Sequence, residues 1–256
     1  MLKAEHICKS YGSQKAVDDV TLTVQDELVT VIIGESGSGK STLVRMLCYI
    51  ERQDSGKIIL NDTELDRKIA KAQRRTVQLV MQDAASSLDP HQSAEHILEE
   101  PLKLLMKMDK ETRKKRIAEL SDLVHFPRDK LKNKVTELSG GQQKRLCIAR
   151  ALAAEPQYII FDEAFSGLDV TLRSQILTML KVLQKQLKTG FLIITHDLDT
   201  AMFMADRIYV MRNGRIIESL DEPKSLLDFE SDYAKELVRA AEYKRQALQN
   251  RKEEYL

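Results

Sequence analysis

The sequence predicts an α/β fold in which a mainly parallel core sheet is flanked by helices. Short runs that are apolar throughout are separated by stretches with helical periodicity. A strand that is covered by helices on both faces has no polar side, so its residues do not alternate in polarity. The runs that we expect to form such strands are Leu28–Ile33, Val77–Met81, Tyr158–Phe161, Phe191–Thr195 and Ile208–Met211.

A glycine-rich loop follows the first of these strands. Residues 34–41 read GESGSGKS, which fits G-x-x-x-x-G-K-[ST] at every fixed position, and the helical pattern of Thr42–Tyr49 comes next. Glycines let backbone N–H groups wrap a phosphate while the helix directs its positive end at the same anion. Lys40 would then reach the β- and γ-phosphates of a nucleotide, and the Ser41 hydroxyl would bind Mg²⁺. The alternative is a glycine- and serine-rich turn that happens to precede a helix.

The region from residue 84 to about residue 136 interrupts the alternation of strands and helices. It contains no convincing strand, and both Ala94–Met108 and Lys110–Leu123 have a helical pattern. The charged stretch Asp232–Leu256 is polar nearly all round in its last part, which is typical of an exposed helix. We therefore expect one domain that spans 1–256, with a core at 1–83 and 137–230, an inserted helical subdomain at 84–136 and a helical tail at 231–256.

A second helix start that contains glycine is the feature that best discriminates between possible functions of the chain. Leu138-Ser139-Gly140-Gly141-Gln142 precedes the helical pattern QQKRLCIARAL, and such a start can bind an anion through its backbone N–H groups. One nucleotide needs only one phosphate loop, so this second start would serve a nucleotide held by another chain. The ordinary alternative is an N-cap, because serine caps helices well and glycine tolerates the turn.

Two adjacent carboxylates, Asp162 and Glu163, follow the strand Tyr158–Phe161. At the tip of a buried strand beside a phosphate loop, Asp162 can hold the magnesium shell and Glu163 can polarise an attacking water. Acidic turns after strands are common, so the pair indicates a functional site only in combination with the phosphate loop upstream. The same holds for His196, which follows the strand Phe191–Thr195 and would lie at the same edge of the sheet.

The segment between these two strands predicts an amphipathic helix, Leu172–Leu187, with Gly190 as its stop. The apolar face of this helix is expected to consist of Leu172, Ile176, Met179, Leu180 and Leu183.

Composition restricts the class of protein. The 256 residues include 40 Lys+Arg and 39 Asp+Glu, and the formal charge of +1 disfavours a protein that coats nucleic acid. Cys8, Cys48 and Cys147 lie far apart, so neither a disulfide framework nor a zinc site is expected, and a reducing compartment is the simple interpretation. Without an apolar signal core at the start or a run of about 20 apolar residues, we expect a soluble intracellular protein.

The motifs resemble those of the ATP-binding cassette (ABC) family, and the resemblance covers essentially the whole chain. GESGSGKST looks like the Walker A motif, LSGGQ at Leu138–Gln142 like the family signature, and YIIFDE at Tyr158–Glu163 like Walker B with its catalytic glutamate. Residues 166–169, SGLD, resemble the D-loop. The motifs occur in family order, which implies a P-loop NTPase fold of the ABC type with an antiparallel β part and a helical subdomain between Q-loop and signature.

The resemblance also implies functions for individual residues. Two cassettes would enclose ATP and Mg²⁺ between Walker A of one chain and the signature of the other, and hydrolysis would reopen the dimer. The implied catalytic residues are Glu163, the switch histidine His196, and Lys40. The implied Mg²⁺ ligands are Ser41, the Q-loop glutamine Gln82, and Asp162. The residues implied to contact the nucleotide are Tyr11, which would stack on adenine, Gly34, Glu35, Ser36, Gly37, Ser38, Gly39, Lys40, Ser41, Thr42, Gln82, Asp162, and in trans Ser139, Gly140, Gly141 and Gln142.

The implied partners are a second cassette, identical or paralogous, and two transmembrane permease subunits. An extracytoplasmic substrate-binding protein would act indirectly, and no nucleic-acid partner is expected. The chain would therefore work at the cytoplasmic face of the cell membrane, as the energy-coupling subunit of a transporter.

A finer resemblance is to the cassettes of peptide and nickel importers. Residues 82–90, QDAASSLDP, are similar to the run Q-D-x-x-x-S-L-[ND]-P of that subfamily, and Glu100-Pro101-Leu102 stands where its members have EPL. Tyr233–Leu237 resembles their C-terminal segment Y-T-x-x-L. Many peptide-importing members continue into a cysteine-bearing extension, whereas this chain has no cysteine after Cys147, so nickel or a metal chelate is favoured over a di- or oligopeptide.

Three other functions are compatible with a single cassette but are disfavoured by the sequence. A cassette of carbon–phosphorus lyase machinery is disfavoured by the run SSLDP after Gln82, which indicates a membrane coupling site. A non-transport cassette that acts on nucleic acid usually has two cassettes or long insertions, and the basic run Arg113–Arg116 is surrounded by acidic residues that indicate a solvated helix face. A regulatory cassette without turnover is disfavoured by the intact Glu163 and His196.

Overall fold

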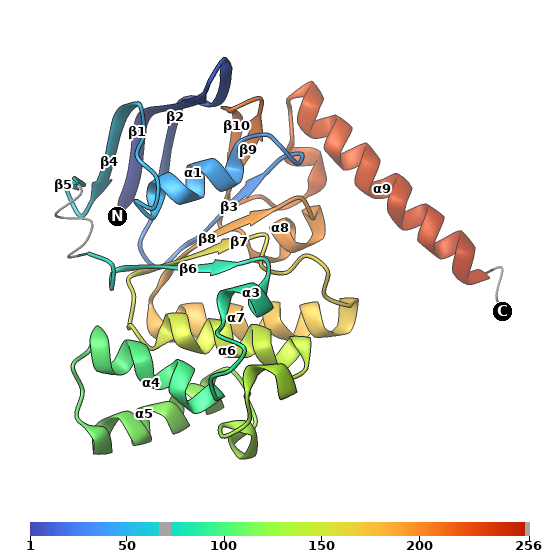
Figure 1. Cartoon of the computed structure of the whole chain (residues 1–256). Helices are drawn as coiled ribbons and strands as arrows, with labels where there is room; N and C mark the ends of the chain where they lie inside the picture. Colours follow the sequence, from blue (N-terminus) through green and yellow to red (C-terminus); the bar gives the residue numbers. More distant parts are fainter. Residues whose placement is uncertain (67–72, 254–256) are drawn as a thin grey trace.

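A six-stranded sheet lies at the centre of the computed structural model, which describes residues 1–66 and 73–253 (Figure 1). The strand order is β10-β9-β3-β8-β7-β6, with β10 antiparallel to β9 and the other neighbours parallel. The strands are β3 (Val29–Ile33), β6 (Val77–Met81), β7 (Tyr158–Asp162), β8 (Gly190–Thr195), β9 (Arg207–Arg212) and β10 (Arg215–Asp221). The expected mainly parallel α/β sheet is confirmed, and each of the five predicted strands is found within one residue at either end.

A second, antiparallel sheet has the order β2-β1-β4-β5. Its strands are β1 (Leu2–Tyr11), β2 (Gln14–Val24), β4 (Ser55–Leu60) and β5 (Thr63–Glu64). Helix α1 (Lys40–Leu47) packs between the two sheets, because one apolar core joins its buried side to inward residues of β1, β2 and β4 and to one face of the central strands (Figure 1).

The opposite face of the central sheet is covered by helices α6 (Gly140–Leu152), α7 (Val170–Leu187) and α8 (Leu198–Met204). Successive residues of a strand point to opposite faces, so Ile160 belongs to the core below the antiparallel sheet and Phe161 to the helical side. The Phe161 ring lies 5.4 Å from that of Phe165 and 5.2 Å from that of Phe191, between centroids. These contacts fix the end of β7, where the two acidic residues lie.

Helices are the only regular elements in the described residues between 84 and 134, apart from an isolated β-bridge between Ser93 and Lys134. The elements are α3 (Ala84–Ser87), α4 (Ala94–Leu104), α5 (Lys110–Leu123) and the 3₁₀ turn η1 (Arg128–Lys130), and a second turn, η2 (Val135–Glu137), follows. The expected extent of α4, to Met108, was too long. Lys107 adopts a left-handed conformation with φ of 52°, which an α-helix cannot continue through.

The stop of α7 differs from the prediction. Lys188, and not Gly190, adopts the left-handed conformation that ends the helix, with φ of 54°. Gly190 is the first residue of β8, and a Cβ there would lie 2.7 Å from the Gln25 carbonyl oxygen and 2.8 Å from the Tyr158 ring. The glycine is therefore required by close packing, because no side chain fits between these two groups.

The last helix, α9 (Asp232–Glu253), packs on the body through Tyr233, Ala234 and Val238 and then projects away from it (Figure 1). Residues 254–256 of the expected tail lie outside the described residues, as do residues 67–72 of the expected core. None of the helices in the described ranges is both long and apolar enough to cross a bilayer.

Candidate nucleotide-binding site

The glycine-rich loop connects the end of β3 to the start of α1, with Lys40 as the first residue of the helix. The Lys40 side chain is buried, and its ammonium donates hydrogen bonds to the carbonyl oxygens of Gly34 (2.8 Å) and Glu35 (2.6 Å) and to Ser38 Oγ (3.1 Å). Burial lowers the pKa of Lys40, and the nearby carboxylates of Glu163 and Asp162 oppose this effect. The loop therefore holds a cation at its centre, where an anionic phosphate would bind.

Gly39 shows why this loop must contain glycine. Its φ is 103°, and a Cβ at this position would lie 2.1 Å from the carbonyl oxygen of Ala16 in β2. Any side chain would collide with the antiparallel sheet as well as strain the backbone. On the other side of the loop, the Gly214 amide donates to the Ser38 carbonyl oxygen (3.0 Å), so the β9–β10 turn also braces the loop.

The acidic residues at the end of β7 lie directly beside the loop. Ser41 Oγ donates a hydrogen bond to Asp162 Oδ1 at 3.1 Å, although 121 residues separate the two in sequence. Burial raises the pKa of Asp162 above its ordinary value, and the hydrogen bond from Ser41 partly offsets this. Glu163 comes next in a left-handed conformation (φ 47°), and its amide donates to the Ile194 carbonyl oxygen (3.0 Å).

The parallel register brings His196 to the same edge of the sheet. Asp162 of β7 pairs with Ile194 of β8, so the residues that follow the two strands are neighbours. His196 Nδ1 lies 3.7 Å from Glu163 Oε2, and both side chains are at least partly exposed. A carboxylate and an imidazole thus face one another beside the loop, an arrangement suited to orienting a water molecule and moving its proton.

The donor set fits Mg²⁺. Hydroxyl and carboxylate oxygens, here Ser41 Oγ and Asp162 Oδ1, are the ligands that this ion prefers, and it commonly takes its remaining ligands from substrate phosphates and water. Within residues 1–66 and 73–253, no group of three or more His, Cys, Asp or Glu side chains could hold a metal on its own. Gln82 follows β6, the neighbour of β7, and its side chain is exposed.

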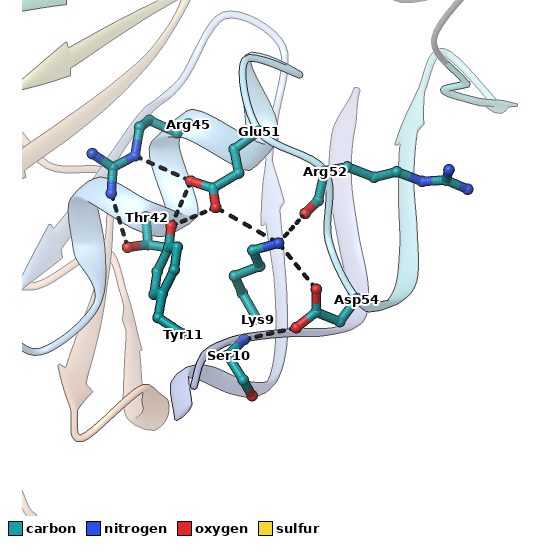
Figure 2. A network of polar contacts seen from close by, with 8 residues as sticks. All are labelled: Lys9, Ser10, Tyr11, Thr42, Arg45, Glu51, Arg52 and Asp54. Atoms are coloured by element: carbon teal, nitrogen blue, oxygen red, sulfur yellow. Dashed lines mark hydrogen bonds and ion pairs between the residues drawn. The ribbon is translucent and has the colours of Figure 1, made fainter. Parts of the chain in front are cut away.

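Tyr11 lies beside the loop at the end of β1. It lines a cavity of about 300 Å³ together with Gln14 and Ala16 of β2, with residues of the loop and α1, and with Glu163. The Tyr11 ring is 44% exposed, and its hydroxyl donates to the Glu51 carboxylate at 2.5 Å (Figure 2). The ring is thus held at the mouth of the cavity by a residue that the sequence did not single out.

Glu51 is the centre of a polar network that the sequence does not predict. Its carboxylate also lies 3.4 Å from Arg45 Nε and 3.6 Å from Lys9 Nζ (Figure 2). Arg45 in turn donates to Thr42 Oγ1 (3.2 Å), so Tyr11 is connected to the helix that follows the loop. The only available signal was the spacing of three residues between Thr42 and Arg45 on one helix, and a single glutamate after a helix gives none.

Tyr233, at the start of α9, is a second contact that the sequence did not predict. Its hydroxyl accepts a hydrogen bond from the Glu35 amide of the loop (3.0 Å), and the guanidinium of Arg212 lies 4.4 Å from its ring centroid. Burial raises the pKa of this tyrosine, so its hydroxyl stays protonated at neutral pH. The loop is therefore braced by the far end of the chain as well as by both sheets.

The second glycine-containing helix start is not brought to the loop. Ser139 caps α6 in the ordinary way, since its Oγ accepts from the Gln142 amide (3.3 Å) while its own amide donates to Gln142 Oε1 (3.0 Å). Ser139 and Gly140 are exposed, and a Cβ on Gly141 would lie 2.9 Å from the Leu172 side chain of α7. In Figure 1, α6 and α1 lie on opposite faces of the central sheet.

Comparison with known proteins identifies the family. The profile of the ABC transporter family matches residues 17–166. The oligopeptide transport ATP-binding protein OppF of Lactococcus lactis is 39% identical over 234 residues, which cover 88% of this chain and 72% of that protein. The nickel import ATP-binding protein NikE of Brucella abortus is 38% identical over 232 residues, which cover 86% of this chain and 87% of that protein.

Solved structures lead to the same family. The chain superposes on cbiO1 of Clostridium perfringens, part of the ABC transporter complex cbiONQ, with a TM-score of 0.81 and 28% identity, covering 98% of both chains. The ATP-binding cassette MJ0796, in a dimeric post-hydrolysis state bound to ADP and Pi, gives a TM-score of 0.76 and 28% identity over 87% of this chain and 99% of that one. The chain therefore belongs to the ABC transporter family and is one of its energy-coupling ATPases.

Proposed function

We propose that this cassette powers an importer of nickel, a metal chelate or a short peptide, and that it hydrolyses ATP at the site described above. The single observation that carries the assignment of the site is the contact between Ser41 Oγ and Asp162 Oδ1. It brings the phosphate loop and the acidic end of β7 together, with Glu163 and His196 beside them. The class of substrate is supported by the names of the relatives, which are oligopeptide and nickel import proteins.

The loop would bind the triphosphate through Lys40 and its backbone amides. The Lys40 ammonium already lies among the acceptors Gly34 O, Glu35 O and Ser38 Oγ, so it can exchange a carbonyl for a phosphate oxygen with little movement. Ser41, Asp162 and Gln82 would hold Mg²⁺, which neutralises phosphate charge when bound. Tyr11 would stack on the adenine at the mouth of the cavity.

Glu163 would accept a proton from the attacking water. Its left-handed backbone turns the residue out of β7, and His196 lies at 3.7 Å to orient the water or the γ-phosphate from the other side. The signature residues Ser139–Gln142, of which Ser139 and Gly140 are exposed, would bind the ATP of a second cassette, because α6 lies on the opposite face of the central sheet from the helix that follows the loop. Closure of the two cassettes would drive two permease subunits at the cytoplasmic face of the membrane.

The test of the site uses Glu163→Gln, with Glu155→Gln as the matched control. Glu155 is a partly exposed glutamate that pairs with Arg75 and Arg116 away from the loop. We expect Glu163→Gln to bind ATP like wild type, to lose most of its ATPase activity and to accumulate ATP-dependent dimers in size-exclusion chromatography. The control should hydrolyse ATP normally. Wild-type turnover by Glu163→Gln would exclude Glu163 as the general base.

The substrate is tested by uptake in cells with and without the gene, using radiolabelled nickel and a labelled dipeptide. Loss of nickel uptake alone makes the cassette the motor of a nickel or metal-chelate importer. Loss of dipeptide uptake with unchanged nickel uptake makes it the motor of a peptide importer. If neither changes, import of these two classes is excluded.

A further inference from the structure

A buried lysine links the signature helix to the segment that carries Gln82. Lys144, in the second turn of α6, is only 3% exposed, and its ammonium donates to the carbonyl oxygens of Met81 (3.0 Å) and Gln82 (2.8 Å). These residues lie at the junction of β6 and the loop that follows, more than 60 residues earlier in the sequence. The contact therefore connects two motifs that local structure does not join.

The same side of α6 makes two further contacts with the segment after Gln82. Arg150 Nη1 donates to the Ser87 carbonyl oxygen at 2.8 Å, and Cys147 Sγ lies 3.3 Å from Ser87 Oγ. Lys144, Cys147 and Arg150 are spaced three residues apart and so share one side of the helix. The segment 81–87 is thus fastened to α6 at both ends.

Separating Gln82 from α6 would be unfavourable because of the buried Lys144 ammonium. A buried ammonium is costly unless acceptors surround it, and burial lowers the pKa of Lys144 accordingly. If Gln82 moved without α6, this charge would lose the two carbonyl dipoles that compensate its loss of water. Gln142, the last signature residue, precedes Lys144 by less than one turn, so movement at Gln82 is transmitted directly to the signature.

We propose that Lys144 is a positioning residue that makes Gln82 and the signature residues Ser139–Gln142 move as one unit, and thereby links the two ATP sites of a cassette dimer. The inference rests on the proposed function, in which Gln82 meets the ATP of its own chain and the signature meets the ATP of the partner. Engagement of the first ATP by Gln82 then orients the signature for the second.

The test compares Lys144→Met with Arg145→Met in the full chain. Arg145 is the next residue on α6 and also donates to a backbone carbonyl (Val124 O, 2.7 Å), and it contacts Met179 Sδ of α7 (3.4 Å), so neither acceptor belongs to the Gln82 segment. Each change is made with and without Glu163→Gln. We measure the Kd of the dilute monomer for ATP, ATP-driven dimerisation by analytical ultracentrifugation in the Glu163→Gln background, and kcat and KM in the wild-type background.

We expect Lys144→Met to leave the monomer Kd for ATP within about twofold of wild type, to weaken ATP-driven dimerisation about tenfold and to lower kcat in proportion. Arg145→Met should change dimerisation by less than twofold. Lys144→Gln, whose amide can still donate to a carbonyl oxygen, should recover part of the loss. A purely structural role would instead lower the melting temperature of both methionine variants without this difference in dimerisation.

Equal dimerisation of Lys144→Met and Arg145→Met would refute the coupling. A loss of ATP binding by the Lys144→Met monomer that is as large as its loss of dimerisation would also refute it. If Lys144→Met does not fold, hydrogen exchange of the Glu163→Gln chain decides. Segments 81–87 and 138–150 must become protected at the same ATP concentration, and protection at different concentrations overturns the proposal. Failure of Glu163→Gln itself to dimerise with ATP would refute the proposed function, which is a separate result.

Discussion

Replacing Glu51 by glutamine should weaken ATP binding through Tyr11 alone. The change keeps the size of the side chain but removes the charge that accepts the Tyr11 hydroxyl at 2.5 Å (Figure 2). A hydrogen bond to a charged group contributes about 1.5–3 kcal/mol when it is buried. Because the Tyr11 ring is 44% exposed, we expect about 0.5–1 kcal/mol here. Since about 1.4 kcal/mol corresponds to a tenfold change, the Kd for ATP should rise about two- to fivefold.

The assay is titration calorimetry with ATP and, separately, with inorganic tripolyphosphate, which has no base to stack. Glu51→Gln should leave the affinity for tripolyphosphate unchanged. Tyr11→Phe should reproduce the loss for ATP, and the double variant should be no weaker than either single variant, because both remove the same bond. If Glu51→Gln weakens tripolyphosphate as much as ATP, the residue acts through Arg45 and Thr42 on the loop helix, and the reasoning about Tyr11 is wrong.

Three further outcomes are expected. Burial raises the folded-state pKa of Asp162 above its unfolded value, so the folded chain binds that proton more tightly and loses stability as pH rises between the two values. Asp162→Asn should flatten this part of the melting temperature–pH profile while it abolishes Mg²⁺-dependent ATPase activity. Phe161→Ala removes a fully buried ring between Phe165 and Phe191, and should lower the unfolding free energy by about 3–5 kcal/mol in denaturant titrations. Ser139→Arg should spare ATP binding by the monomer but block ATP-driven dimers. Ser139→Ala removes the cap hydroxyl, which would also contact the partner's ATP, and costs about 1 kcal/mol of stability. It adds no bulk or charge at the interface, so this variant should still dimerise.

The central strands were predictable because burial on both faces makes them apolar throughout. β8 is buried at every position, and its sequence, GFLIIT, is apolar nearly throughout, as expected of a strand covered on both faces. β10, with its alternating exposed and half-buried residues, and the long strands β1 and β2 lack such runs and were found only by resemblance, as an antiparallel part. Where a helix ends was equally hard to predict, because Lys107 and Lys188 take up conformations that favour glycine.

In the candidate site, too, some residues could be predicted from the sequence and others could not. Residues that we expect to approach the phosphates lie within fixed local patterns, so Lys40, Ser41, Asp162 and Glu163 could be named from sequence. Residues that hold those groups in place act across long sequence separations. Glu51 reaches back 40 residues to Tyr11, and Lys144 reaches back 62 residues to Gln82, and no local pattern records such pairs. Their contribution comes from tertiary packing and is visible only in the folded chain.

The bracing of the phosphate loop has a consequence for the order of folding. The loop is complete only when Ala16 lies against Gly39, Gly214 has bonded to Ser38 and Tyr233 has bonded to Glu35, the last across 198 residues. Contacts between residues so far apart in sequence form slowly, because the intervening chain must first be ordered. The ability to bind ATP should therefore emerge among the last events of refolding, well after the secondary structure. A nascent chain on the ribosome would acquire it only once the start of α9 has left the exit tunnel.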